Sequence, residues 1–273
     1  MRALRTAFVL TIALGLSGCF QLHTVLRVFP DGSGRLITSI EISEAAFAQV
    51  QRLATLDPDQ KGGSSLIDEE ALRTAAKGYG PGVTFEGVKP MDGERGYTAT
   101  YRVEDVTTLA LPLTPEPASS FGTPSPDSTP SDLVTFGFTP TDGGTPAELT
   151  IQMPDFLSED SPMTMDVGSL GGASADTKGD PEFEMLRGVM QGMQATFRVE
   201  PQGTVTATTA TFEADGTITL MRFDFDEMLA DPDALNRLDA QEPPATTEDL
   251  AERIAEVPGV DVEVQPTVTV TFE

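Results

Sequence analysis

Three adjoining segments near the N-terminus decide the fold: Thr24–Phe29 (TVLRVF), Pro30–Gly34 (PDGSG) and Arg35–Ile42 (RLITSIEI). The first has the composition of a strand. In the third, from Leu36 onward, Leu, Thr, Ile and Ile recur at every second position, which is the period of a strand. The middle segment holds aspartate and glycine, residues that tolerate the positive φ angles of tight turns. The stretch therefore predicts an antiparallel hairpin.

Helical and strand patterns follow this hairpin. Ser43 can cap a helix with Phe47, Val50 and Leu53 on one face, and Asp68–Lys77 predicts a second helix that ends at glycines. Further strands are expected at Val83–Val88, Tyr97–Val103, Leu133–Phe138, Leu149–Met153, Ala195–Glu200, Thr204–Phe212 and Thr217–Phe225.

Helices are also expected at Asp180–Met193, at Asp226–Leu238 and after Thr247, which can cap the last of them. Apolar residues between Val260 and Phe272 keep one parity and predict a closing strand. Pro266 inside that run indicates an edge position or a bulge. Together the patterns predict an α+β protein with a mainly antiparallel sheet and helices packed on one side.

The two ends of the chain follow a similar order of elements. Residues 24–88 and 195–264 both pass from strands through two helices to a Pro-Gly-Val segment and a strand. We interpret this as two pseudo-duplicated halves; coincidence among short segments is the alternative. The expected organisation is a signal peptide (1–18), an N-terminal α+β unit (19–110), a Pro/Ser/Thr-rich insertion without a core of its own (111–132), a central hairpin, flexible loop and helix (133–194), and a C-terminal α+β unit (195–273).

The N-terminus has the anatomy of a signal peptide. Arg2 and Arg5 precede the apolar run Ala7–Leu14, which is too short to span a bilayer. Leu16-Ser17-Gly18-Cys19 resembles the lipobox of bacterial lipoproteins. The resemblance implies cleavage before Cys19, diacylglycerol on its thiol and acylation of the new amine. Such an anchor is stable, because each buried methylene contributes roughly 0.8 kcal/mol.

Export to the cell envelope follows from this interpretation; an ordinary secretory signal with a chance cysteine is the alternative. Cys19 is the sole cysteine of the chain, so no intramolecular disulfide can form. Lipoprotein sorting of the enterobacterial type retains a protein at the inner membrane when aspartate follows the cysteine. Phe20 stands there instead, so we expect the outer rather than the inner membrane in a cell with two.

The net charge of −26 excludes nucleic acid as a partner, because such a surface repels nucleic acid and anionic headgroups. It suits divalent cations or basic partners, but we interpret it first as a general surface adaptation. The lack of tryptophan, with only three tyrosines, argues against a glycan-binding cleft.

Nucleophilic catalysis and zinc binding find little support. The sole histidine, His23, stands four residues from Cys19, where we expect a membrane-proximal tether, and Gly32-Ser33-Gly34 fits a turn and no nucleophile elbow. Pairs of carboxylates for a hydrolase are available among 43 acidic residues, but that number makes any one pair uninformative. We therefore expect no enzyme.

The segment from Asp57 to Asp68 has part of the pattern of a calcium-binding EF-hand loop. Asp57, Asp59 and Asp68 stand at positions 1, 3 and 12, and glycine stands at position 6. Position 5 is Lys61, which removes a ligand, and Asp68 is shorter than the usual glutamate. We expect a plain loop between two helices and keep Ca²⁺ as the alternative.

A second resemblance is to LppM-type envelope lipoproteins. It rests on the strand–turn–strand unit after the cysteine, on Gly96-Tyr97 with Asp105-Val106, and on Phe197–Gly203 followed by Asp215-Gly216. The resemblance implies an envelope α+β domain without a settled enzymatic role that handles apolar ligands. We expect a non-enzymatic binding or assembly module; an apolar or lipid ligand and a carboxylate-dependent hydrolase are the alternatives.

Overall fold

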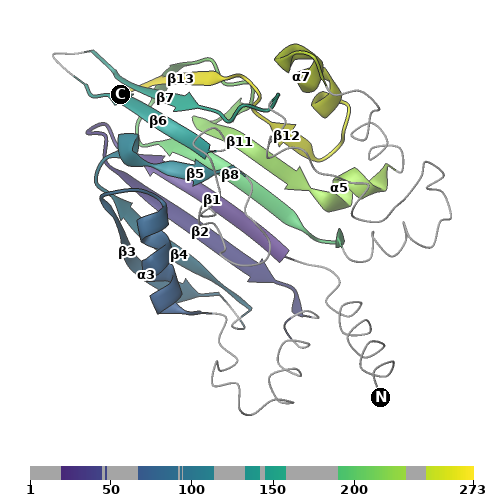
Figure 1. The fold of residues 1–273 in the computed structure, drawn as a ribbon, viewed down its shortest axis with the longest axis horizontal. Helices are drawn as coiled ribbons and strands as arrows, with labels where there is room; N and C mark the ends of the chain where they lie inside the picture. Colours follow the sequence, from purple (N-terminus) through teal and green to yellow (C-terminus); the bar gives the residue numbers. More distant parts are fainter. Residues whose placement is uncertain are drawn as a thin grey trace, which may run out of the picture.

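The computed structural model describes residues 20–44, 67–91, 95–113, 133–141, 145–157, 190–231 and 244–273, together with Phe47 and Gly93. Strands dominate these segments and form two β-sheets, an eight-stranded sheet A and a five-stranded sheet B, which lie one over the other (Figure 1). The mainly antiparallel pairing expected from the sequence is confirmed. None of the helices in the described segments is long and apolar enough to cross a membrane.

Sheet A has the strand order β10-β11-β8-β1-β2-β4-β3, and β12 pairs with β11. Its strands are β1 (Phe20–Val28), β2 (Gly34–Ile42), β3 (Val83–Pro90), β4 (Gly96–Val103), β8 (Gln194–Pro201), β10 (Glu213–Ala214), β11 (Thr217–Asp224) and β12 (Val260–Val262). Of the described pairs, β1 with β8 is parallel and the others are antiparallel. β1, the first strand of the described segments, therefore lies in the middle of the sheet.

Sheet B has the order β5-β6-β7-β13-β9. Its strands are β5 (Ala110–Pro112), β6 (Leu133–Thr139), β7 (Ala147–Gln152), β9 (Val205–Thr208) and β13 (Thr267–Phe272). The antiparallel pairing of β6 with β7 confirms the predicted central hairpin. Because β9 and β13 come from the C-terminal part of the chain, sheet B ties that part to the middle of the sequence.

The β1–β2 hairpin forms as the opening stretch predicts. Its register runs from Phe20 opposite Ile42 to Val28 opposite Gly34. In the turn, Gly32 has a φ of 83°, and an Asp31 carboxylate oxygen accepts hydrogen bonds from the Ser33 amide at 2.9 Å and the Ser33 hydroxyl at 2.6 Å. The turn sequence thus satisfies its own polar groups.

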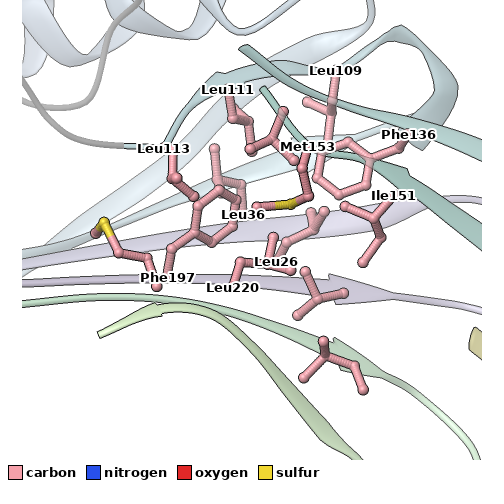
Figure 2. Close-up of a cluster of buried hydrophobic side chains, with 14 of the residues drawn as sticks. Leu26, Leu36, Leu109, Leu111, Leu113, Phe136, Ile151, Met153, Phe197 and Leu220 are labelled. Atoms are coloured by element: carbon pink, nitrogen blue, oxygen red, sulfur yellow. The ribbon is translucent and has the colours of Figure 1, made fainter. Parts of the chain in front are cut away.

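The hydrophobic core lies between the two sheets. Figure 2 shows a cluster in which sheet A contributes Leu26, Leu36, Phe197 and Leu220, and the opposite layer contributes Leu109, Leu111, Leu113, Phe136, Ile151 and Met153. All ten side chains are buried. Burial of one such side chain stabilises a fold by roughly 1.5–3 kcal/mol, so this layer is the main source of stability.

Three helices and a short 3₁₀ helix complete the described part: α3 (Glu69–Gly78), η2 (Val106–Thr108), α5 (Phe225–Ala230) and α7 (Thr247–Ala255). The helix predicted at Asp68–Lys77 is confirmed as α3, and Asp68 caps it by accepting the amides of Glu70 and Ala71. The cap of α7 is Thr246, one residue before the predicted Thr247.

α3 covers one end of sheet A. The ring of Tyr79, just after α3, lies edge-on to Tyr101 of β4 at a centroid distance of 5.2 Å. The Arg73 guanidinium lies 4.9 Å from the centre of the Phe85 ring on β3. The helices expected after Ser43 and from Asp180 fall almost wholly outside the described residues, and of the helix expected at Asp226–Leu238 the structure describes the first part, as α5.

Two predicted strands are wrong as continuous elements. The run Thr204–Phe212 forms β9 in sheet B only as far as Thr208, and the chain then crosses to β10 in sheet A. The closing run from Val260 likewise forms β12 in sheet A, crosses at residues 263–266 and forms β13 in sheet B. Pro266 therefore marks a crossing between sheets and no bulge within one strand.

The predicted insertion is wrong at its first residues. Leu111 lies in β5, and both Leu111 and Leu113 are buried in the core. In the proposed halves, the strands after the two Pro-Gly-Val segments take different positions. β3 is separated from β2, the hairpin strand of its half, by β4, whereas β12 pairs with β11, the preceding strand of its half, with no strand between them. The order of elements is thus similar, but the placement of these strands differs.

Candidate functional site

The residues predicted for lipidation and calcium binding lie mostly outside the described segments. Cys19 immediately precedes β1, and Asp57 and Asp59 fall in a segment that the structure does not describe. Asp68 is described, and its carboxylate oxygen accepts the Glu70 and Ala71 amides at 3.0 Å each. Asp68 therefore has a structural role at the start of α3. Among the described residues, no group of three or more His, Cys, Asp or Glu side chains could hold a metal ion.

A small cavity lies between the sheets. Its wall includes Thr24, Thr38, Tyr79, Leu113 and Phe197. The volume is about 20 Å³, which is room for about one water molecule. Burial raises the pKa of the Tyr79 hydroxyl, so this residue is neutral at physiological pH. A cavity of this size is too small for an acyl chain.

The other face of sheet A, here called the outer face, is formed by the side chains that point away from sheet B. Along β1, Leu22, Leu26 and Val28 are buried toward the core, and the alternate residues His23, Val25 and Arg27 are partly exposed. Strand alternation gives β2, β4 and β8 the same division. Val25 lies opposite Ile37 of β2, so a half-buried aliphatic pair occupies the middle of this face.

Three arginines lie side by side across the outer face. Arg27 of β1 lies opposite Arg35 of β2, and Arg35 lies opposite Arg102 of β4. We call these three residues the arginine row. Arg27 pairs with Glu200 at 2.9 Å and Arg35 with Glu86 at 3.1 Å. Arg102 has no ion pair within the described part of the chain, and its side chain is exposed.

Arg198 lies beside the row. Arg198 stands on β8 opposite Val25 of β1. Its side chain is exposed and makes no ion pair with any described residue. The row and Arg198 carry four positive charges, against two from Glu200 and Glu86. The arginine row, Arg198 and their two glutamate partners therefore form a local excess of positive charge on a chain whose net charge is −26.

His23 also lies on this face, which corrects its expected place in a tether. It is opposite Ser39 and Thr196 in the register, and its Nδ1 lies 2.8 Å from the Thr196 hydroxyl. Burial lowers the pKa of His23, and the charge of Arg198 lowers it further, while Glu41 acts in the opposite direction. The imidazole is therefore neutral at pH 7.

Acidification is expected to destabilise the protein through His23. The unfolded histidine titrates near pH 6.5 and the folded one lower, so between these values the unfolded state binds more protons. The stabilisation is complete above about pH 6.5 and is lost as the pH falls through the folded pKa. We expect wild type to lose more stability than His23→Gln between pH 7.5 and about 5.5, measured by urea unfolding. Equal losses in the two proteins would contradict the prediction.

Carboxylates gather around Arg222 on β11, but they have structural partners. Arg222 lies 2.8 Å from Glu227 and 3.2 Å from Asp261, and the Glu227 contact is the main reason that its pKa is raised. Asp224 caps α5 and accepts a hydrogen bond from Gln194. The cluster joins α5 and β12 to β11, so its acids are held in ion pairs and caps.

Sequence reasoning did not find the arginine row. Arg27, Arg35 and Arg102 each stand at an outward position of a predicted strand, so the alternation could have placed each on a solvent-facing side. Their alignment depends on the β1–β2 and β2–β4 registers. The turn fixes the first register, but β2 and β4 are separated by more than fifty residues, and nothing local fixes the second.

Comparisons with known proteins give one structural match. No family model matches the chain, and the search of curated proteins finds no relative. The NMR structure of the folded domain of the Mycobacterium tuberculosis LppM protein is similar with a TM-score of 0.28 and 10% sequence identity, over 94% of this chain and 91% of that one.

Proposed function

We propose that the chain is an envelope lipoprotein, anchored through Cys19, that acts as a non-enzymatic binding or assembly module. The observation that carries the proposal is the start of β1 at Phe20, one residue after the lipobox cysteine. A lipid on Cys19 would attach directly to the end of a central strand of sheet A. The domain would then stand at the membrane without a flexible linker, and Phe20 favours the outer membrane where there are two.

The binding surface in this proposal is the outer face of sheet A and not the interior. The cavity between the sheets has a volume of about 20 Å³, whereas sites for small ligands usually occupy about 300–1,000 Å³. The apolar-ligand alternative therefore has no support from the described residues. The hydrolase alternative needs free carboxylates in a cleft, and the acids around Arg222 are already paired. The calcium loop remains a separate proposal that rests on the sequence pattern alone.

Substitution of Cys19 by serine is expected to abolish membrane anchoring. In phase separation with a cloud-point detergent, we expect the wild-type chain in the detergent phase and Cys19→Ser in the aqueous phase, because serine cannot receive the thioether-linked diacylglycerol. Mass spectrometry should find acyl chains on wild type and no further bound lipid. The His23→Gln variant, which leaves the lipobox intact, is the control and should partition like wild type.

Two results would contradict the proposal. Wild-type protein in the aqueous phase would show that Cys19 carries no lipid anchor. A lipid retained in addition to the anchor in the native mass spectrum would restore the apolar-ligand alternative.

A further inference from the structure

The arginine row brings no clear gain in stability to the fold. Like charges directly opposite one another on neighbouring strands destabilise a sheet, and the row places two such pairs in succession, Arg27 with Arg35 and Arg35 with Arg102. Glu200 and Glu86 offset part of the repulsion. Because the paired side chains of Arg27 and Arg35 are 43% and 45% exposed, solvent screens both the repulsion and the ion pairs, so neither contributes much to stability. Stability therefore does not explain the row.

We propose that the arginine row, with Arg198 beside it, binds the phosphate groups of an anionic polymer. The inference deepens the proposed function, because it names the ligand class for the outer face of sheet A. An anion at the row would neutralise the repulsion between neighbouring guanidinium groups. Arginine suits this role, since its planar fork of donors matches the oxygens of phosphate and carboxylate.

The carboxylates already paired with the row favour phosphate over carboxylate as its ligand. Neighbouring strands lie about 4.8 Å apart, so adjacent guanidinium groups can reach oxygens of one phosphate. A ligand must also compete with the carboxylates of Glu200 and Glu86, which lie 2.9 and 3.1 Å from Arg27 and Arg35. A carboxylate ligand would only replace the glutamate carboxylates by an equivalent group. A phosphate offers more charge and more acceptor oxygens at one centre.

The position of the row favours a polymer in the aqueous space over headgroups of the anchoring membrane. Arg27 is seven residues beyond Phe20 on β1, which places it about 23 Å along the strand from the anchored end. The acids elsewhere on the chain do not prevent binding, because the Debye length at physiological ionic strength is about 8 Å. They do keep polyanions away from the rest of the surface.

The test measures binding of inorganic polyphosphate to the full-length lipidated protein in a neutral detergent. The row variant is Arg27→Gln/Arg35→Gln/Arg102→Gln. The control variant Arg73→Gln/Lys77→Gln/Arg253→Gln removes the same charge from helices α3 and α7. We expect the row variant to bind at least about tenfold more weakly, with a shallower dependence of affinity on salt, and the control to stay within about twofold of wild type.

A second measurement separates binding from folding. Removal of the row should leave the melting temperature unchanged or higher, because it relieves repulsion between like charges; a fall of more than about 5 °C would mark the row as structural and overturn the proposal. Equal loss of binding in both variants would also overturn it, as would equal affinity for polyglutamate. Binding to anionic vesicles without binding to polyphosphate would assign the site to lipid headgroups and overturn the proposal that the ligand is a polymer.

These outcomes are independent of the anchor. If Cys19→Ser stays in the aqueous phase as expected and polyphosphate does not bind, the ligand proposal fails and the anchored module stands. If wild type is not anchored and polyphosphate binds at the row, the anchored module fails and the ligand proposal stands.

Discussion

Replacement of Glu263 by alanine is expected to lower the free energy of unfolding by about 3 kcal/mol. Glu263 is fully buried, and its carboxylate accepts hydrogen bonds from the Thr211 amide at 2.6 Å, the Thr211 hydroxyl at 3.0 Å and the Gln265 amide at 3.1 Å. Alanine would leave these donors without the carboxylate and would open a cavity. Urea unfolding followed by circular dichroism measures the change, since the chain has no tryptophan.

Two controls locate the effect in these hydrogen bonds. Glu148→Ala, at an exposed position on β7, should change stability by less than about 0.5 kcal/mol. Thr211→Val should cost stability in wild type but much less in the Glu263→Ala background, because the hydroxyl bond is already lost. Additive effects of the two substitutions, or a loss below about 1 kcal/mol for Glu263→Ala, would show that Glu263 does not hold the crossing.

Glu263 also explains where the sequence misled. It lies between β12 and β13, at a position whose parity predicts an outward, solvated side chain. Thr211 lies between β9 and β10, in the other run that was expected to be one strand. The carboxylate joins these two crossings between sheet A and sheet B. A local period of two describes each half of such a run equally well, so alternation cannot reveal that the chain changes sheets.

The elements predicted well are those whose signals are local. The β1–β2 hairpin is set by Asp31, Gly32 and Ser33, and the start of α3 by Asp68, so neighbouring residues suffice. The candidate site depends instead on long-range pairing. The arginine row needs β2 to lie against β4, and the half-buried place of His23 needs β1 to lie against β8. No single segment carries that information.

Replacement of Gly80 by alanine is expected to lower the free energy of unfolding by about 3–5 kcal/mol, at least as much as Glu263→Ala. Gly80 has a φ of 136°, and an added Cβ would lie 2.1 Å from the Thr108 carbonyl oxygen. Around it, the Ala110 amide donates to the Tyr79 carbonyl at 3.0 Å. The clash is with backbone, which cannot move aside as a flexible side chain could. Urea unfolding and the yield of soluble protein both measure the effect.

Gly87→Ala is the matched control, because an added Cβ there meets nothing within 4 Å. It should change stability by less than about 1 kcal/mol in either direction. The comparison tests a specific contact: the segment after α3 packs against η2 and β5, and so it connects the α3 end of sheet A to the first strand of sheet B. If both variants were equally stable, this approach of Gly80 to Thr108 would be wrong. If Gly80→Ala alone unfolds early, the junction between the two sheets depends on a residue without a side chain.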